Sequence, residues 1–278
     1  MKQNKKIIFL DIDGTIYGKP GIIPESAKQA VRLARENGHR IYLGTGRNKA
    51  EVAEDIWDMG FDGMVGSAGA YVEHQGELIF NQHLPQSYLN DLYRFFEKHK
   101  IVYTVETNDY LYGTRENVEK QYQYFEHVFT GDAGEIKSLE LFDSITKIVD
   151  DIYQVKDVNK ILFYDAPVTL EEVRREFGDH FMVTPSSVGK ITGESAEMYD
   201  VNISKATGIE HLLTYLGEAQ EDTIAFGDGS NDFEMLEYVG IGIAMGNGVS
   251  ALKKTADMVT DTAINDGLYK GFKLCGLI

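Results

Sequence analysis

Two carboxylates stand at the end of an apolar run near the start of the chain. Asp11 and Asp13 follow Ile7–Leu10 and are separated by one isoleucine. Side chains two positions apart in a strand point the same way, so the two carboxylates would lie side by side unless the chain turns. Neighbouring carboxylates repel each other, and a bound cation relieves that repulsion. The stretch therefore predicts either a metal-assisted active site or a strand that ends in a polar turn.

Two further loops carry polar or acidic side chains and, like Asp11 and Asp13, follow apolar runs. Gly44–Arg47 follows the apolar stretch 41–43, and Gly227–Asp232 follows the apolar stretch 223–226. Each loop alone has a structural interpretation as a turn or a helix cap. In an open α/β sheet, however, ligands bind at the carboxyl ends of the strands. The joint occurrence of three such loops favours one site to which all three contribute.

The elements that would position these loops alternate between strand and helix. A helix is predicted to open at Pro24 and to close before Gly38, and it is followed by a strand over 41–43. The alternation returns after Lys205, with a helix, a buried-type strand and another helix. Such β-α-β-α order predicts a Rossmann-like parallel sheet with helices on both faces.

The spacing also predicts a second domain. The chain between Thr45 and Lys205 is far longer than the sheet requires, and it contains strand patterns of its own at 101–105 and 160–164. We therefore expect an inserted α/β cap domain at 84–184, with the core formed by 1–83 and 185–278.

Composition limits the partners. The 278 residues carry a net charge of −17, which argues against nucleic acid and anionic membrane surfaces as partners. No apolar run approaches the roughly 20 residues of a membrane span. The single cysteine, Cys275, fits a reducing compartment and predicts a cytoplasmic protein. The oligomeric state is not predicted by these features.

The four polar segments together resemble the haloacid dehalogenase (HAD) superfamily of phosphotransferases, and within it the Cof-type phosphatases. Asp11–Thr15 is similar to the first motif of that family, D-x-D-G-T, and Thr45 matches the second. Lys205 matches the third motif, and Gly227–Asp232 matches the fourth almost letter for letter. The resemblance implies an Mg²⁺-dependent phosphatase that acts through an aspartyl-phosphate.

The resemblance also implies a role for each residue. Asp11 would be the nucleophile and Asp13 the general acid and base, while Thr45 and Lys205 would hold the phosphoryl oxygens. Substrate-binding residues would be Gly46, Arg47 and Asn231. The metal would be held by Asp11, the backbone carbonyl of Asp13, Asp228 and Asp232, the last either directly or as a neighbour of the ligands.

Other functions remain open at this point. A phosphomutase on the same scaffold and a non-catalytic phosphate-binding protein would carry the same motifs. The expected substrate is a small phosphorylated metabolite such as a sugar phosphate, a nucleotide or a cofactor phosphate. Ala68 departs from the subfamily, which usually has asparagine before this Gly-Ala pair, and this departure puts a substrate contact at that loop in doubt.

Overall fold

The computed structural model describes residues 5–185 and 193–278. The described chain divides into two compact units. Unit 1 comprises Met1–Arg47, Val52–Asn81 and Ser204–Ile278, and unit 2 comprises Asn48–Glu51 and Gln82–Ile203. Within the described ranges, no helix has both the length and the apolar character needed to cross a membrane.

Unit 1 is built on an eight-stranded sheet. In spatial order its strands are β14 (Met258–Val259), β13 (Ile241–Ala244), β12 (Thr223–Gly227), β1 (Ile7–Leu10), β2 (Arg40–Gly44), β3 (Gly63–Gly66), β4 (Tyr71–His74) and β5 (Glu77–Asn81). The pairs from β14 to β3 are parallel, and β4 and β5 add an antiparallel edge. The predicted parallel sheet is confirmed.

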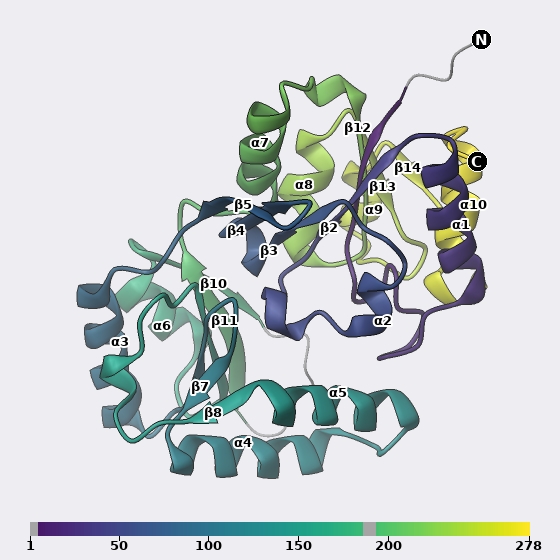
Figure 1. Ribbon diagram of the computed structural model, residues 1–278. Coiled ribbons are helices and arrows are strands. Elements are labelled where there is room, and N and C mark those ends of the chain that lie inside the picture. The colour runs from purple at the N-terminus through teal and green to yellow at the C-terminus, as the bar shows by residue number, and fades with distance from the viewer. Residues whose placement is uncertain (1–4, 186–192) are drawn as a thin grey trace. The chain divides into compact units, whose positions relative to one another are not determined.

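Helices cover both faces of this sheet (Figure 1). They are α1 (Glu25–Glu36), α2 (Glu54–Trp57), α7 (Lys205–Leu216), α8 (Phe233–Tyr238), α9 (Leu252–Thr255) and α10 (Gly267–Leu274). Because strand side chains alternate, Ile8 and Leu10 pack with α1 and α10, whereas Ile7 and Phe9 pack with α7 and α8. The first helix buries Ala27, Ala30, Val31 and Ala34, the face predicted from their spacing.

Unit 2 has a separate six-stranded sheet. Its spatial order is β10 (Phe181–Pro185), β11 (Glu194–Asp200), β9 (Lys160–Ala166), β6 (Val102–Glu106), β7 (Leu111–Gly113) and β8 (Thr146–Ile148). All pairs are antiparallel except β7 with β8. The helices are α3 (Gln86–His99), α4 (Arg115–Val128), α5 (Ala133–Ile145) and α6 (Leu170–Phe177).

Two apolar clusters hold unit 2 together. One face of its sheet packs against α3 and α6, for example Phe163 against Phe96. The other face packs against α4 and α5, where Phe125 contacts Tyr164 and Phe142. Unit 2 therefore has a core of its own.

The unit boundaries differ from the expected domain boundaries at one end. The first lies between Asn81 and Gln82, close to the predicted start of the insertion at 84. The second lies between Ile203 and Ser204, not at 184/185, because β11 pairs with β9 and β10 in the sheet of unit 2. The expected boundary adjoins 186–192, which lie outside the described residues.

Candidate active site

Three neighbouring strands of unit 1 end at the same level. Leu10 at the end of β1 is in register with Phe226 of β12 and Leu43 of β2. Asp11 follows at once, and its backbone N–H donates to the Phe226 carbonyl at 3.0 Å. The loops after β1, β2 and β12 thus begin at one sheet edge, as the parallel order predicts.

Lys205 joins two of the predicted carboxylates. Its Nζ lies 2.7 Å from Asp11 Oδ1 and 2.5 Å from Asp232 Oδ1, and its side chain is only 1% exposed. Ser204 places it there as the N-cap of α7, where its Oγ accepts from Thr207 N while Thr207 Oγ1 accepts from Ser204 N. The capping box therefore fixes Lys205 at the first helical position.

The fourth motif supplies two carboxylates of the cluster, those of Asp228 and Asp232. Asp232 Oδ2 accepts hydrogen bonds from the backbone N–H groups of Asp228 and Gly229, at 2.9 and 2.8 Å. Carboxylate oxygens of Asp11, Asp228 and Asp232 all lie within 4.8 Å of one another. Oxygen ligands at such spacing fit Mg²⁺. The Asp13 side chain is not in this group, and metal binding by its backbone carbonyl stays a prediction.

The electrostatics of the cluster call for a cation. Burial raises the pKa of Asp11 well above its ordinary value; Lys205 opposes that effect, and Asp232 adds to it. Burial and the repulsion of Asp232 raise the pKa of Asp228 to about 6. Burial lowers the pKa of Lys205, but Asp11 and Asp232 outweigh it and hold that pKa above its usual range. One lysine faces three carboxylates, so a divalent ion would complete the charge balance.

The chain turns between the two carboxylates that begin the first motif. Asp11 is buried, whereas the Asp13 side chain is 53% exposed. Backbone N–H groups of Ile16 and Tyr17 both donate to the Ile12 carbonyl, which closes the turn. Gly14 has φ +83°, and a Cβ there would lie 2.1 Å from Asp228 Oδ2. Only glycine fits this position, since both the backbone angle and the approach exclude a side chain.

Arg47 binds Asp13 in this structure. Its Nε and terminal nitrogen donate to the two carboxylate oxygens of Asp13, at 2.8 and 2.7 Å. Such a two-point ion pair fixes the guanidinium plane as well as its charge. The expected substrate contact of Arg47 would have to replace or share this pair.

The remaining predicted residues lie in the same unit. Thr45 is buried, and its Oγ1 accepts from Arg47 N at 3.1 Å. Gly46 lies between these two residues and is partly exposed. Asn231 is partly exposed in the single turn Ser230–Asp232, directly before the buried Asp232.

Sequence reasoning assigned no role to two residues that the structure brings to this cluster. Asn247 Nδ2 donates to Gly14 O at 2.8 Å and to Asp228 Oδ2 at 3.2 Å. Thr15 Oγ1 donates to Asp228 Oδ1 at 3.3 Å. Both orient the Asp228 carboxylate. Their positions in the sequence could have indicated this role, since Thr15 ends the first motif and Asn247 follows the strand β13. A threonine or an asparagine alone, however, does not identify a site.

The loop that contains Ala68 supports the second and third motifs. Ala68 N donates to Thr45 O at 3.2 Å, and a Cβ on Gly69 would lie 1.9 Å from Ser204 O. Ser67 and Ala68 both have left-handed backbone, with φ 49° and 57°. Asparagine adopts this conformation more readily than alanine, so Ala68 is strained where the subfamily has a favourable residue.

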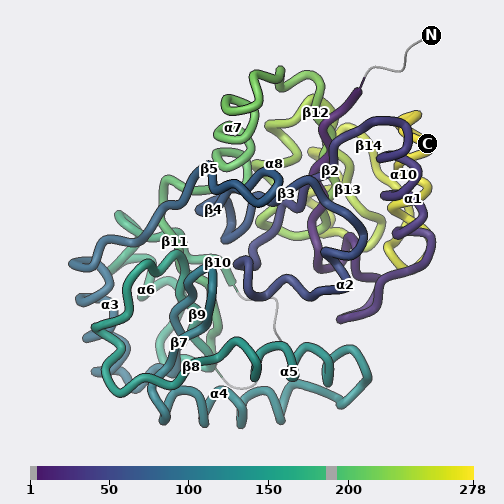
Figure 2. The backbone as a smooth tube through the Cα atoms, in the orientation of Figure 1, coloured from purple at the N-terminus to yellow at the C-terminus, as the bar shows by residue number. Residues whose placement is uncertain are grey.

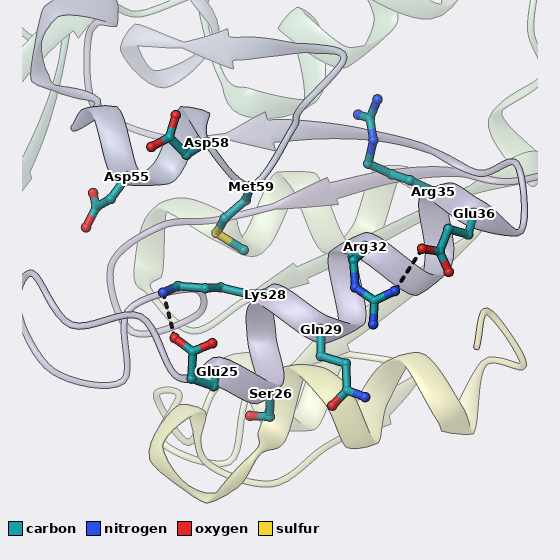
Figure 3. Close-up of a pocket in the computed structure, with 10 residues that line it drawn as sticks. All are labelled: Glu25, Ser26, Lys28, Gln29, Arg32, Arg35, Glu36, Asp55, Asp58 and Met59. Atoms are coloured by element: carbon teal, nitrogen blue, oxygen red, sulfur yellow. Dashed lines mark hydrogen bonds and ion pairs between the residues drawn. The ribbon is translucent and has the colours of Figure 1, made fainter.

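A surface groove of about 1010 Å³ lies elsewhere in unit 1. It is formed by α1 and α2, and none of the predicted site residues lines it (Figure 3). Its charges are paired along α1, with Lys28 bound to Glu25 and Arg32 bound to Glu36. The carboxylate cluster, and not this groove, is therefore the candidate active site.

Comparison with known proteins agrees with this geometry. YkrA of Bacillus subtilis (strain 168), whose name assigns it only provisionally as a phosphatase, is 29% identical over 99% of this chain and 100% of its own. YitU of the same organism, named 5-amino-6-(5-phospho-D-ribitylamino)uracil phosphatase, is 27% identical over 98% of each chain. The solved structure of BT4131, described as a HAD subclass IIB sugar phosphatase, superposes with a TM-score of 0.75 at 27% identity, covering 99% of this chain and 100% of that one.

The family profile described as haloacid dehalogenase-like hydrolase matches residues 8–272, a range that includes every residue of the candidate site. The chain therefore belongs to the haloacid dehalogenase-like hydrolase family.

Proposed function

We propose that this enzyme, a hydrolase of phosphate esters, acts on the phosphate monoesters of small metabolites through an aspartyl-phosphate on Asp11, with Mg²⁺ as cofactor. The observation that supports it best is the contact of Lys205 with Asp11 at 2.7 Å, beside Asp228 and Asp232. A nucleophilic carboxylate, a buried cation and two further metal-type ligands are the groups that phosphoryl transfer requires.

The first half of the reaction uses Asp11 and Asp13. Lys205 holds Asp11 Oδ1, so Oδ2 is the oxygen that attacks phosphorus. The new bond joins that oxygen to phosphorus while the bond to the ester oxygen breaks, and Asp13 gives its proton to the departing alcohol. Lys205 and Thr45 would offset the charge on the phosphoryl oxygens, and bound Mg²⁺ would lessen the repulsion between substrate and carboxylates.

The second half returns the enzyme to its starting state. Asp13, now ionised, takes a proton from water as its oxygen attacks the phosphorus of the aspartyl-phosphate. The bond between phosphorus and Asp11 breaks, and orthophosphate leaves. Asp13 cannot transfer protons while both its oxygens are held by Arg47, so this ion pair has to open when substrate binds.

The substrate class rests on the relatives. YitU is named for a phosphorylated ribitylamino compound, and BT4131 is described as a sugar phosphatase. The compounds that these two names indicate are small polar phosphate monoesters, and we propose a substrate of this class for the present enzyme. A cytoplasmic location, which the single Cys275 favours, would suit such a metabolite.

Two isosteric variants test the assignment of the carboxylates. Asp11→Asn removes the nucleophile, so turnover of every ester is expected to fall by several orders of magnitude. Asp13→Asn removes proton transfer together with the charge that Arg47 pairs with, and the loss should be about 10²–10⁴-fold for an alkyl phosphate. The loss should be smaller for an aryl phosphate, whose phenolate leaves without a proton.

The measurements are steady-state turnover of both ester types with Mg²⁺ and mass spectrometry of the trapped enzyme. Equal losses for the two esters in Asp13→Asn would contradict its role as general acid. A phospho-enzyme in Asp11→Asn would contradict the nucleophile. Isomerised product without release of orthophosphate would identify a phosphomutase, and binding of phosphate esters without turnover would identify a binding protein.

A further inference from the structure

A tyrosine that the proposed mechanism does not use lies beside Arg47. The Cζ atom of Arg47 is placed over the ring of Tyr17, 5.5 Å from the ring centroid. Both residues belong to unit 1. A guanidinium within about 6 Å of a ring centroid is attracted by the negative face of the aromatic ring. Tyr17 is thus a further partner of the guanidinium that binds Asp13.

The ring of Tyr17 is held in place by its surroundings. Tyr17 lies on the loop between β1 and α1, whose course can be followed in Figure 2. Its backbone N–H donates to Ile12 O at 2.9 Å, and Tyr17 forms a backbone bridge with Asp13. The residue is only 3% exposed and belongs to the same apolar cluster as Ile16. A ring packed in this way presents its face at a constant position.

The side chain of Arg47 has more freedom than its backbone. The backbone is held, because Arg47 N donates to Thr45 Oγ1 at 3.1 Å and Arg47 O accepts from Ser67 N at 2.8 Å. The side chain is 24% exposed, and a long side chain loses many rotamers when it is ordered. Its ion pair with Asp13 has to open in the proposed reaction. The contact with Tyr17 remains available when that happens.

The contact with Tyr17 differs from the ion pair in the part of the guanidinium that it uses. A ring face attracts the positive charge and does not tie each N–H donor to a particular acceptor. The donors can therefore exchange a carboxylate for a phosphate while the ring stays in contact. Burial raises the pKa of Tyr17 to about 12, although Arg47 opposes this effect, so the phenol keeps its proton at neutral pH.

We infer that Tyr17 is a positioning residue for Arg47: its ring holds the guanidinium at the edge of the site when the ion pair with Asp13 opens. In the proposed function, on which this inference rests, the guanidinium then binds the phosphate of the substrate. Tyr17 itself touches no reacting atom in this mechanism. It keeps Arg47 near the point at which phosphate arrives, so that binding does not have to order a free side chain.

A double-mutant cycle between Tyr17 and Arg47 tests this inference. The dissociation constant of inorganic phosphate is measured by calorimetry, with Mg²⁺ present, for the whole protein and for Tyr17→Leu, Arg47→Met and the double variant. Residues that act through one another are not additive, so Tyr17→Leu should weaken phosphate binding about 3- to 10-fold in the wild type and by less than about twofold in Arg47→Met. Additive losses, or no loss in Tyr17→Leu, would overturn the inference.

Two aromatic variants separate the ring face from the volume of the side chain. Tyr17→Phe keeps the face, so phosphate affinity should stay within about twofold of wild type. Pentafluorophenylalanine at position 17 keeps the shape of phenylalanine but has an electron-poor face, so it should weaken phosphate binding as Tyr17→Leu does. Equal affinities in these two variants would contradict the inference. This pair also decides the question should Tyr17→Leu fail to fold.

Phe272→Leu is the matched control. Phe272 is a fully buried aromatic residue of the same apolar cluster, and its ring contacts Phe226. Loss of this ring disturbs the core of unit 1 but leaves the contact between Tyr17 and Arg47 in place, so phosphate affinity should stay within about twofold of wild type. Equal losses in Tyr17→Leu and Phe272→Leu would show a merely structural role for Tyr17 and would refute the proposal.

The two proposals fail separately. Wild-type protein that binds phosphate but hydrolyses no ester contradicts the proposed function, while the cycle still decides on Tyr17. Wild-type protein that hydrolyses esters and gives an additive cycle contradicts only the positioning role.

Discussion

Each unit of this protein contains a buried lysine that contacts two carboxylates. In unit 1, Lys205 lies between Asp11 and Asp232, and in unit 2, Lys160 lies between Glu106 and Glu197. Both lysines have a pKa above the usual range, because the carboxylates outweigh the effect of burial. The charge pattern is the same, but the surroundings differ.

The difference lies in what balances the excess negative charge. In unit 2 two further carboxylates act on Lys160, those of Glu197 and Glu51, and both residues are partly exposed, so water can solvate them. In unit 1 both partners of Lys205 are buried, and Asp228 adds a third carboxylate within 4.8 Å. Water cannot offset that excess, whereas a metal ion can. The comparison teaches that a buried lysine between acids marks a reactive site only where further acids remain uncompensated.

The sharpest contrast is expected in turnover. Lys205→Met removes a cation that touches the nucleophile, so the turnover number should fall by about 10²–10³-fold. Lys160→Met leaves the reacting groups in place, and its turnover number should remain within about tenfold of wild type. Steady-state kinetics of both variants with one aryl phosphate measures this. A comparable loss of turnover number in both variants would contradict the distinction between the two lysine clusters.

Thermal stability should separate the two clusters through the metal. Each methionine variant leaves buried carboxylates without their cation, which costs about 3–5 kcal/mol. In Lys205→Met, Mg²⁺ can take the place of the lost charge, so saturating Mg²⁺ should raise the melting temperature more than in wild type. In Lys160→Met the metal-induced shift should equal that of wild type. Equal shifts in all three proteins would show that the carboxylates of unit 1 do not bind the ion.

The pH dependence of metal binding sharpens the same point. The pKa of Asp228 is raised to about 6 without metal, so this carboxyl holds a proton below that pH and a metal must displace it. Mg²⁺ affinity should therefore fall as the pH drops through 6. Calorimetric titration from pH 5 to pH 8 measures it, with Asp228→Asn as control, which should bind weakly at every pH. Affinity independent of pH over this range would be inconsistent with Asp228 as a ligand.

The smallest effect is expected at Ala68. Its left-handed backbone is unfavourable for alanine, and Ala68→Asn should raise the free energy of unfolding by about 1 kcal/mol. Ala68→Val, which is β-branched, should lower it. Chemical denaturation measures both, with Ala70→Asn as a matched control, since Ala70 has ordinary right-handed backbone with φ −70°. Destabilisation by Ala68→Asn would mean that the buried position has no room for the amide.

Much of the site could be predicted because strand ends are local features. Asp11, Thr45 and Asp228 each follow a short apolar run, and parallel order brings such ends to one edge. The ion pair between Arg47 and Asp13 could not be predicted, since it depends on the turn at Gly14 that separates Asp13 from Asp11.

The cluster of unit 2 escaped sequence analysis for another reason. Glu106 and Lys160 end and begin ordinary strand patterns, and only the register of β6 against β9 sets them opposite each other. The expected boundary at 184/185 differs from the unit boundary at Ile203/Ser204 for the same reason, because β11 continues the sheet of unit 2 after the expected end of the insertion. The residues around each strand do not show which distant strand it will pair with or in which register, so such pairings are hard to predict from sequence.

The order of segments in unit 1 has a consequence for its synthesis. The first strand lies between β2 and β12, and Ile7 pairs with Arg40 on one side and Thr223 on the other. At about 5–20 residues per second, the ribosome delivers β12 roughly 10–40 s after β1. During that interval one edge of β1 has no strand to pair with, and the whole of unit 2 is made before β12 appears. Unit 2 can therefore fold first, and a nascent chain that stalls before Ser204 would expose an apolar strand edge to chaperones or to aggregation.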